Sequence, residues 1–365
     1  MHIVYLIENI DTVGGIQNGL SIRVNELVKK YNHKITIVCT NHNTKVPAYN
    51  FDQSIEIIFL EKLISRSSLI GRLILQWKQS KMIIKSLKPD VVITVKYTMH
   101  NVFFKFLNSN VKFVSELRET KENYDQHKSK AIKSRFYICL RDFILKRQDL
   151  LIVLTEADKR KWGFNNIKVI KNTKTFESDT VSSLNNKVAL AVGRLEKVKR
   201  FDLLIEIWQS VVKKAPDWQL KICGKGSEYK YLDSLINKYK LRKSVIITNH
   251  FVDVKKELLN SSLLLMTSKF ESFGNVLVEA KICGVPAIAF DVPNGPSEII
   301  ENEEDGYLIN DGNTEEMLKR VLQLINNESK RKQMGKHSKL NEEKFDVVTI
   351  IKNYNEILLN LFSTK

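Results

Sequence analysis

The sequence predicts an α/β protein built from two doubly wound units, each with a mainly parallel sheet between layers of helices. Short apolar, β-branched runs alternate with longer helical stretches along the chain, as strands and crossover helices do in parallel sheets. The pattern pauses at a polar interval over residues 173–187 and then starts again. In addition, 365 residues exceed what one hydrophobic core commonly serves.

The expected strands follow the apolar runs. In the first unit they are 2–7, 35–40, 55–60, 91–95, 111–115, 150–154 and 168–170. In the second unit they are 188–192, 219–223, 245–248, 263–266, 287–290 and 307–309. A last helix over 346–362 is separated from the second sheet and is expected to pack back on the first. We therefore expect a first domain of residues 1–175, completed by residues 346–365, and a second domain of residues 188–345.

Composition predicts a globular protein without membrane spans. Hydrophobic residues make up 43% of the chain and charged residues 27%, as in ordinary folded domains. The first eight residues have no basic leader, and no apolar run approaches the roughly 18 residues of a membrane span. The cysteines have apolar neighbours and no paired spacing, so we expect core residues in a reducing compartment. These are Cys39, Cys139, Cys223 and Cys283. The expected location is cytoplasmic.

Positive charge is concentrated in the first half of the chain. The formal net charge is +17, and residues 1–180 contain 30 Lys and Arg against 17 Asp and Glu, while residues 181–365 contain 28 against 24. Such a surface predicts an anionic partner, either nucleic acid or anionic lipid headgroups.

Two stretches concentrate this charge. Residues 62–88 contain seven basic residues and no acid, interleaved with apolar residues at helical spacing, and residues 128–147 contain Lys130, Lys133, Arg135, Arg141 and Lys146 against Asp142. A basic amphipathic helix on an anionic membrane surface explains the first stretch. A helix that packs on the core and exposes a basic face explains it equally well.

The stretch from Lys269 to Ala280 is the most informative about chemistry. Glu271 and Glu279 flank a Ser-Phe-Gly-Asn turn that opens a helix, where unpaired N–H groups and the helix dipole favour an anion. Eight residues at about 100° each return to within roughly 80° of the start, so both acids lie near one face. One carboxylate could hold a hexose and the other a ribose. An ordinary helix with a favourable start is the alternative.

Two further motifs lie where expected strands end. Gly14-Gly15 precedes a helix over about 17–31, where paired glycines would let the backbone approach a phosphate. Arg194 and Lys199 follow the strand 188–192, and two cations there can neutralise a diphosphate. A plain connector and ordinary surface charge are the alternatives.

Together these motifs resemble the family-4 glycosyltransferases, which are retaining enzymes of the GT-B architecture. The resemblance covers nearly the whole chain, and its motifs are specific jointly rather than singly. They are Gly14-Gly15, Gly193-Arg194 with Lys199, Ile222-Cys223-Gly224-Lys225-Gly226, Phe270-Glu271-Ser272-Phe273-Gly274, Glu279-Ala280, Gly284-Val285-Pro286 and Gly295-Pro296-Ser297-Glu298. The resemblance implies two Rossmann-like domains facing across a cleft, the first binding the acceptor and the second the nucleotide sugar.

The resemblance also implies a role for each motif. The Gly14-Gly15 amides, Arg194 and Lys199 would hold the diphosphate. Glu271 would contact the donor sugar and Glu279 the ribose. Other expected donor-binding residues are Gly193, Gly224, Phe251, Ser272, Phe273, Gly274, Asn275 and Val276.

One departure concerns the strand 111–115. Many family members place a histidine after it, whereas this chain has Glu116-Leu117-Arg118-Glu119. A Ser-Glu-x-Arg pattern is similar to that of a subset of enzymes that build bacterial surface polysaccharide. On that likeness Glu116 or Arg118 joins Glu271, Arg194 and Lys199 as a catalytic candidate. A surface ion pair is the alternative.

We therefore expect a retaining transferase that moves a hexose or N-acetylhexosamine, with UDP as the expected nucleotide, to a lipid-linked or cell-surface glycan. In this family the donor β-phosphate is thought to take the acceptor proton during front-side attack, so no protein nucleophile is required. Arg194, Lys199 and helix-start amides would stabilise the departing diphosphate. No Asp-x-Asp pair is present to hold a cation, so no metal or other cofactor is expected.

Two alternatives stay open. A UDP-sugar epimerase of the same architecture would convert its sugar without an acceptor. A non-enzymatic nucleic-acid-binding protein would explain the charge but leave Glu271 and Glu279 unused. We favour the transferase, attached peripherally to the inner face of the cell membrane through its basic first domain and without a nucleic-acid partner.

Overall fold

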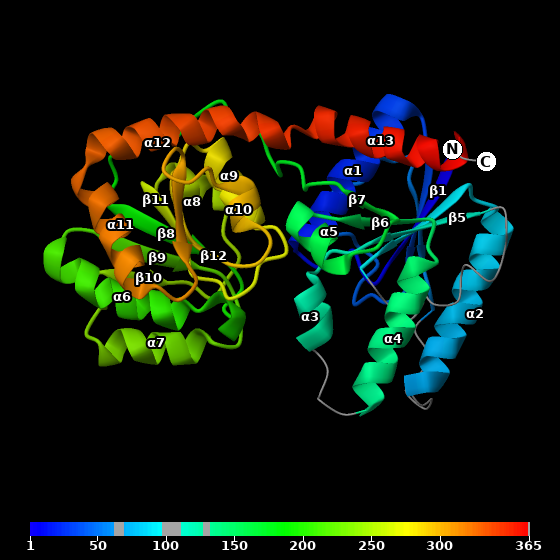
Figure 1. The fold of residues 1–365 in the computed structure, drawn as a ribbon, viewed down its shortest axis with the longest axis horizontal. Coiled ribbons are helices and arrows are strands. Elements are labelled where there is room, and N and C mark those ends of the chain that lie inside the picture. Colours follow the sequence, from blue (N-terminus) through cyan, green and yellow to red (C-terminus); the bar gives the residue numbers. More distant parts are fainter. Residues whose placement is uncertain (62–68, 97–110, 127–131, 364–365) are drawn as a thin grey trace. The chain divides into compact units, whose positions relative to one another are not determined.

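The computed structural model describes residues 1–61, 69–96, 111–126 and 132–363 of the chain. They form two compact units. Unit 1 comprises Met1–Thr173 and Val347–Lys365, and unit 2 comprises Lys174–Asp346. Each unit is a parallel sheet flanked by helices (Figure 1).

Among the described residues, the sheet of unit 1 has seven parallel strands in the order β3-β2-β1-β4-β5-β6-β7. The strands are β1 (His2–Ile7), β2 (Lys34–Cys39), β3 (Glu56–Phe59), β4 (Val91–Val95), β5 (Lys112–Glu116), β6 (Leu150–Val153) and β7 (Ile167–Val169). The helices are α1 (Gly15–Tyr31), α2 (Leu69–Leu87), α3 (Lys121–Gln126), α4 (Ile132–Lys146), α5 (Glu156–Trp162) and α13 (Val347–Ser363).

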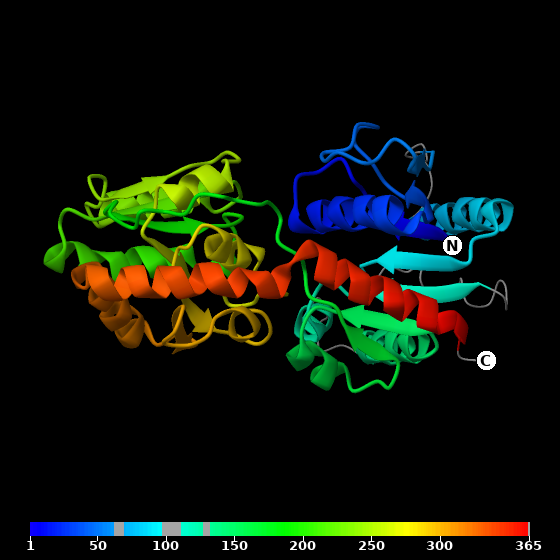
Figure 2. The same cartoon turned by 90° about the horizontal axis from the view of Figure 1, so that it is seen from above.

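Both faces of this sheet are buried, because successive side chains along a strand point to opposite sides. Ile3 and Tyr5 of β1 belong to the core under α1 and α13, whereas Val4 and Leu6 belong to the core under α2. Figures 1 and 2 show α13 on the same face of the sheet as α1. The end of the chain therefore completes the core of unit 1.

In the described residues of unit 2, six parallel strands lie in the order β10-β9-β8-β11-β12-β13. The strands are β8 (Val188–Val192), β9 (Gln219–Cys223), β10 (Val245–Ile247), β11 (Leu263–Met266), β12 (Ala287–Asp291) and β13 (Gly306–Asn310). The α-helices are α6 (Phe201–Lys214), α7 (Tyr229–Lys238), α8 (Val254–Leu259), α9 (Asn275–Ile282), α10 (Pro296–Ile299), α11 (Thr314–Asn326) and α12 (Glu328–Leu340). Short 3₁₀ helices are η2 (Lys197–Lys199) and η3 (Asn341–Phe345).

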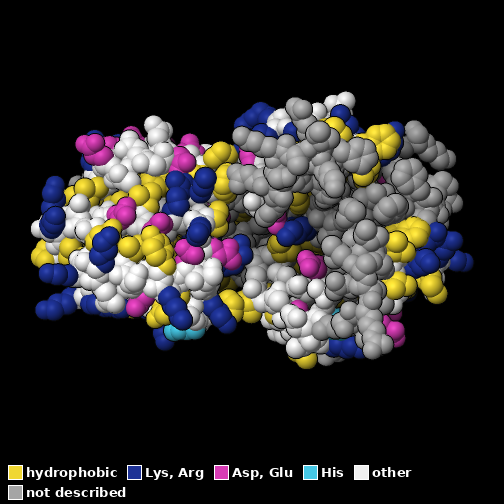
Figure 3. Space-filling model, turned by 90° about the horizontal axis from the view of Figure 1, so that it is seen from below, with side chains coloured by type: hydrophobic (Ala, Val, Ile, Leu, Met, Phe, Trp, Pro, Cys, Tyr) yellow, Lys and Arg dark blue, Asp and Glu magenta, His cyan; other side chains and the backbone are white. Residues whose placement is uncertain are grey.

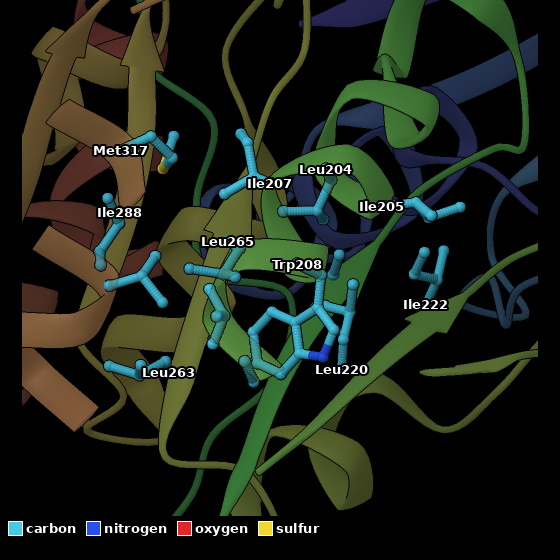
Figure 4. Close-up of a cluster of buried hydrophobic side chains, with 14 of the residues drawn as sticks. Leu204, Ile205, Ile207, Trp208, Leu220, Ile222, Leu263, Leu265, Ile288 and Met317 are labelled. Atoms are coloured by element: carbon cyan, nitrogen blue, oxygen red, sulfur yellow. The ribbon is translucent and has the colours of Figure 1, made fainter. Parts of the chain in front are cut away.

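The core of unit 2 is centred on Trp208. This side chain is fully buried, and Figure 4 shows it between other apolar residues of α6 and those of β9 and β11. The buried positions of α6 recur every three or four residues, which gives the helix one apolar face. Truncating a buried tryptophan costs about 3–5 kcal/mol, so this packing fixes α6 against the sheet and sets the position of the β8–α6 connection.

The predicted fold class is confirmed. Each expected strand is present with ends that differ by at most one residue. The polar interval expected between the domains lies on unit 2. Its backbone is held there by hydrogen bonds from the Lys174 N–H to Phe345 O (2.9 Å) and from the Ser182 N–H to Cys283 O (2.8 Å).

One expectation about the cysteines was wrong. Cys39, Cys223 and Cys283 are buried, and burial raises the pKa of each thiol, to about 12, 11 and 12 respectively. Cys139 is exposed, because it lies on a solvent-facing side of α4. None of the helices within the described ranges has the length and apolarity needed to cross a membrane.

Candidate functional site

Two predicted site residues meet at the carboxyl edge of the unit 2 sheet. β8 and β11 are neighbours in this sheet; β8 leads to η2, which ends at Lys199, and β11 leads to Glu271. The Lys199 Nζ lies 2.6 Å from Glu271 Oε1, although 72 positions separate the two residues. Parallel strands place their carboxyl ends at one edge, which is why residues so distant in sequence come together.

Hydrogen bonds between the two loops hold this pair in place. The Thr267 hydroxyl donates to the carbonyl oxygens of Lys199 (3.1 Å) and Arg200 (3.0 Å). The Lys269 N–H donates to Val198 O at 2.8 Å. Glu271 is 8% exposed and accepts a second hydrogen bond from the Ser268 hydroxyl at 2.6 Å. The carboxylate is thus oriented by two donors at the rim of the sheet.

Arg194 is held differently. Its side chain is 72% exposed and donates to Glu196 Oε1 at 2.7 Å. Exposed ion pairs contribute about 0–1 kcal/mol, so an incoming diphosphate could displace Glu196 at little cost. Contact between Arg194 and the phosphates of the nucleotide sugar stays a prediction.

The predicted glycines after β8 and β9 act in packing. A Cβ on Gly224 would lie 1.8 Å from Gly193 O, so only glycine allows these two turns to approach. The Gly193 N–H donates to Cys223 O (3.0 Å) and the Gly224 N–H to Thr248 Oγ1 (3.1 Å). Both N–H groups are therefore already hydrogen-bonded within the protein. These glycines can contact a nucleotide sugar by van der Waals packing but not by N–H donation.

The turn into α9 has a constrained backbone. Gly274 precedes the helix with φ of 101°, a conformation that favours glycine, and α9 begins without a side-chain cap. Phe273 is buried edge-on to Phe345, so its backbone alone can face a ligand. Gly295 packs against the same turn, because a Cβ there would lie 2.4 Å from Phe273 O. The helix start that follows, at Asn275 and Val276, favours an anion.

Glu279 lies further along α9, in a half-buried position. Its Oε1 accepts a hydrogen bond of 2.9 Å from the Thr175 hydroxyl. Burial raises the pKa of Glu279, and the Thr175 hydrogen bond opposes that rise. Among the described residues no cation pairs with this carboxylate, in contrast to Glu271.

Phe251 follows β10 and is 63% exposed. An exposed aromatic ring at the carboxyl edge of this sheet can stack on a planar base. Ser272 is half-buried in the turn before Gly274.

In unit 1, Gly14 and Gly15 stand at the start of α1. Gly14 has an extended backbone, with φ of −175°, which any residue can adopt. Its N–H donates to the Tyr49 hydroxyl at 3.2 Å, and a Cβ there would meet the end of the Gln17 side chain. The conformation therefore does not require glycine at position 14, and the predicted phosphate contact of this loop stays a prediction.

Glu116 and Arg118 lie in a buried cluster at the carboxyl end of β5. The Glu116 side chain is fully covered. Its oxygens accept from Arg23 Nη1 (2.9 Å to each), from Arg118 Nε (3.0 Å) and Nη2, and from the Tyr354 hydroxyl (2.6 Å). The Tyr5 hydroxyl lies 3.1 Å from the Tyr354 hydroxyl, and Arg118 Nη1 also donates to Asn172 Oδ1 (3.0 Å).

Electrostatics keep this cluster charged. Burial alone would raise the pKa of Glu116, but the guanidiniums of Arg118 and Arg23 together hold it below its usual value. The pair is not on the surface, so the surface alternative for Glu116 and Arg118 was wrong. A carboxylate whose oxygens already accept from two arginines and a tyrosine is built to hold α1, β5 and α13 together. Arg118 is 8% exposed, and the predicted catalytic role of Glu116 or Arg118 stays a prediction.

Sequence reasoning missed four residues that complete these sites. They are Arg23, Tyr354, Ser268 and Thr175. Arg23 and Tyr354 look like ordinary helix residues, because nothing local marks a partner 93 or 238 positions away. Ser268 stands three residues before Glu271, so a capping-like spacing could have singled it out.

The described part of the chain has no cluster of metal ligands. Across residues 1–61, 69–96, 111–126 and 132–363, no three His, Cys, Asp or Glu side chains gather as metal ligands do.

The fold is similar to that of solved glycosyltransferases of the GT-B architecture. A mutant of TarM from Staphylococcus aureus, solved with fondaparinux, α-GlcNAc-glycerol and UDP, is similar to it with a TM-score of 0.79 at 19% identity, over all of both chains. Sucrose-phosphate synthase of Thermosynechococcus elongatus has a TM-score of 0.83 at 16% identity, again over all of both chains. At such identities the likeness shows the fold alone.

Sequence similarity shows the family. Residues 172–341 match the family model described as glycosyl transferases group 1. An uncharacterized glycosyltransferase of Haemophilus influenzae is 30% identical over 363 residues, which cover 97% of this chain and 99% of that protein. The amylovoran biosynthesis glycosyltransferase AmsD of Erwinia amylovora is 28% identical over 365 residues, covering 97% and 98%. The chain belongs to this glycosyltransferase family, which confirms the predicted family and enzyme class.

Proposed function

We propose that this protein is a retaining hexosyltransferase that moves a hexose or N-acetylhexosamine from a UDP sugar to a lipid-linked or cell-surface glycan. The observation that carries the proposal is the Lys199–Glu271 pair at the rim of unit 2, beside the uncapped start of α9. A cation, a carboxylate and a helix start in one place suit a diphosphate sugar.

The names of similar proteins support the donor and acceptor classes. The TarM structure contains UDP and α-GlcNAc-glycerol. A poly(ribitol-phosphate) α-N-acetylglucosaminyltransferase of Staphylococcus aureus is 32% identical over 219 residues, covering 59% of this chain and 44% of that protein. AmsD is named for amylovoran biosynthesis. Surface-polymer synthesis is therefore the proposed setting.

In the proposed reaction Lys199 exchanges its partner. Lys199 leaves Glu271 to neutralise the diphosphate, and the released carboxylate accepts hydroxyl groups of the sugar. The bond between the sugar C1 and the β-phosphate oxygen breaks, while the acceptor oxygen bonds to C1 from the same side. The β-phosphate takes the acceptor proton and UDP leaves, so retention needs no protein nucleophile.

Positive charge in this proposal comes from Lys199 and Arg194 rather than from a metal ion. Charge placed in advance where it develops in the transition state lowers the barrier. Adding EDTA should therefore leave the rate of UDP release unchanged. A loss of activity that Mg²⁺ or Mn²⁺ restores would overturn the metal-independent part of the proposal.

The test of the function is UDP release from a panel of UDP sugars in the presence of lipid-linked glycan acceptors. We expect release that depends on the acceptor with at least one sugar, and a thermal shift with UDP alone. Conversion of the sugar without acceptor would instead indicate an epimerase. No release and no thermal shift with UDP or GDP would contradict the proposal.

Membrane attachment through unit 1 is a further part of the proposal. On α2, Ile74, Leu75 and Met82 are exposed by 49%, 40% and 72%, and Lys78 and Lys85 are also exposed. Residues 74, 78, 82 and 85 fall on one side of a helix, which suits an anionic bilayer surface. Figure 3 shows basic and hydrophobic side chains together on the part of unit 1 where Figure 1 places α2.

One basic residue of the second stretch is not available to a membrane surface. Arg141 is fully buried between Asp125 and Asp142, so it cannot contact lipid. The side chains of Lys130, Lys133 and Arg135, and residues 62–68 of the first stretch, lie outside the described residues.

Replacing Lys78, Lys81 and Lys85 with Glu should abolish sedimentation with vesicles that contain anionic phospholipid and leave UDP binding unchanged. A matched control replaces Lys213, Lys214 and Lys238 of unit 2 with Glu. If the α2 variant sedimented like the wild type, the basic face of α2 would be an ordinary solvent-exposed surface and the attachment proposal would fail.

A further inference from the structure

We infer that Thr175 is a positioning residue for nucleotide binding: its hydroxyl orients Glu279 so that the carboxylate accepts both hydroxyls of the donor ribose. This inference rests on the proposed function, in which Glu279 binds ribose. It adds a residue that none of the sequence motifs contains. The contact that carries it is the 2.9 Å hydrogen bond from Thr175 Oγ1 to Glu279 Oε1.

The backbone around Thr175 is fixed on both sides. The Lys174 N–H donates to Phe345 O at 2.9 Å, and the Lys174 ammonium lies 2.8 Å from Glu177. Two residues after Thr175, the Glu177 carbonyl accepts from the Lys255 ammonium at 2.8 Å. A hydroxyl on a segment tied down in this way directs its partner instead of following it, which is how outer groups preorganise a binding residue.

The hydrogen bond from Thr175 leaves Glu279 able to accept from the two hydroxyls of a ribose. Two adjacent hydroxyls donate best to one ionised carboxylate, which accepts through both oxygens. Thr175 engages Oε1 alone, and the described residues place no hydrogen-bond donor on Glu279 Oε2. Oε1 is thus held in place and retains a further lone pair, while Oε2 is left to accept from a ribose hydroxyl.

The two glutamates of the site are therefore prepared by different groups. Glu271 is oriented by a cation and a serine, Lys199 and Ser268. Glu279 is oriented by a neutral hydroxyl, so binding the uncharged ribose does not require an ion pair to break. Thr175 is the second residue of unit 2, which begins at Lys174, so the segment that enters the unit supplies part of the proposed nucleotide site.

The test compares UDP with 2′,3′-dideoxy-UDP, which lacks the ribose hydroxyls. Isothermal titration calorimetry measures the dissociation constant of each nucleotide for the wild type and for the Thr175→Val, Thr175→Ser and Glu279→Gln variants. Thr175→Val should weaken UDP binding about tenfold, as expected for a hydrogen bond to a charged group. It should not change the affinity for 2′,3′-dideoxy-UDP, and Thr175→Ser should restore UDP binding.

Thr180→Val provides a matched control in the same segment. Equal losses for UDP and 2′,3′-dideoxy-UDP in Thr175→Val would show a purely structural role and overturn the inference. UDP binding by Thr175→Val as tight as in the wild type would also overturn the inference. If Glu279→Gln loses UDP binding in that case, the proposed function stands. A wild type that binds no UDP would overturn both the proposed function and the inference.

Discussion

Glu116 and Glu271 both lie on the carboxyl side of an interior strand, since Glu116 is the last residue of β5 in unit 1 and Glu271 follows β11 in unit 2. They differ in their partners. Glu116 is completely covered and accepts from two arginines and a tyrosine. Glu271 keeps a side-chain exposure of 10%, and its partner Lys199 keeps 18%. A carboxylate with every acceptor site filled holds elements together, whereas one held by a single cation can exchange that cation for a ligand.

The largest effect is expected from Glu116→Gln. The change leaves Arg23 and Arg118 buried without a counter-charge, and breaking a buried pair costs about 3–5 kcal/mol. Urea unfolding should show this loss in the free energy of unfolding. Glu119→Gln is the matched control, because Glu119 pairs with Lys96 at the surface and such pairs contribute about 0–1 kcal/mol. A Glu116→Gln protein of normal stability that has lost activity would instead place Glu116 among the catalytic residues.

The next effect is expected from Lys199→Ala, and on activity. Removing a group that stabilises developing charge lowers kcat by about 10²–10³-fold. Steady-state UDP release with the preferred sugar measures it. Lys197→Ala, in the same short helix and exposed, should behave as the wild type. If Lys199→Ala lost stability in proportion to activity, the Lys199–Glu271 pair would be structural like the cluster at Glu116.

A smaller effect concerns Glu279 and pH. Burial raises the pKa of Glu279 in the folded protein, so ionisation of this carboxyl lowers the free energy of unfolding. The destabilisation develops as pH rises above the pKa that Glu279 has in the unfolded chain, and it is absent at lower pH. Glu279→Gln should therefore raise the melting temperature at neutral pH while weakening UDP binding. The neighbouring titratable group is Cys283, which stays neutral because its pKa is about 12.

The same raised pKa makes UDP affinity fall as pH decreases, starting at a higher pH than for an exposed glutamate. Calorimetric titrations between about pH 5 and pH 8 measure this. Glu279→Gln is the reference that reports the titration of UDP itself, because the terminal phosphate of a nucleotide takes up a proton at about pH 6. If the affinity of the wild type changed with pH no more than that of Glu279→Gln, Glu279 would not contact the ribose as an anion.

The smallest effect is expected from Glu196→Gln. Arg194 is exposed and paired with Glu196, so releasing it should tighten UDP binding by roughly two- to fivefold, the range that corresponds to exposed ion pairs. The gain should shrink as salt is added. Weaker UDP binding in this variant would mean that Glu196 orients Arg194 rather than competing for it.

Much of the fold could be predicted from sequence, because apolar runs that are buried on both faces are visible in sequence. The expected strand 188–192 is a continuous apolar run and the strand 2–7 is apolar after His2, and the structure has both with the same bounds. The segment 174–187 was harder to assign: it is polar, and what ties it to unit 2 is a set of backbone hydrogen bonds such as Ser182 N–H to Cys283 O. Backbone hydrogen bonds leave no trace in residue type.

The candidate site divides in the same way. Lys199, Glu271 and Glu279 could be proposed from motif order, because each follows a strand or opens a helix. The packing role of Gly224 could not, since it depends on the carbonyl of Gly193 lying where a Cβ would be. Neither could the burial of Glu116, because two of its partners, Arg23 and Tyr354, come from the first and last helices of unit 1.

By itself the sequence determined the two parallel α/β units, the edge of each sheet where the candidate site residues lie, and the glycosyltransferase family. The tertiary structure decided which distant polar groups meet: Lys199 with Glu271, Thr175 with Glu279, and Arg23 with Glu116. The physical reason is range. Periodicity and turn chemistry act over a few residues and can be recognised locally, whereas a hydrogen bond needs two groups about 3 Å apart, and only the packed sheets bring distant loops that close.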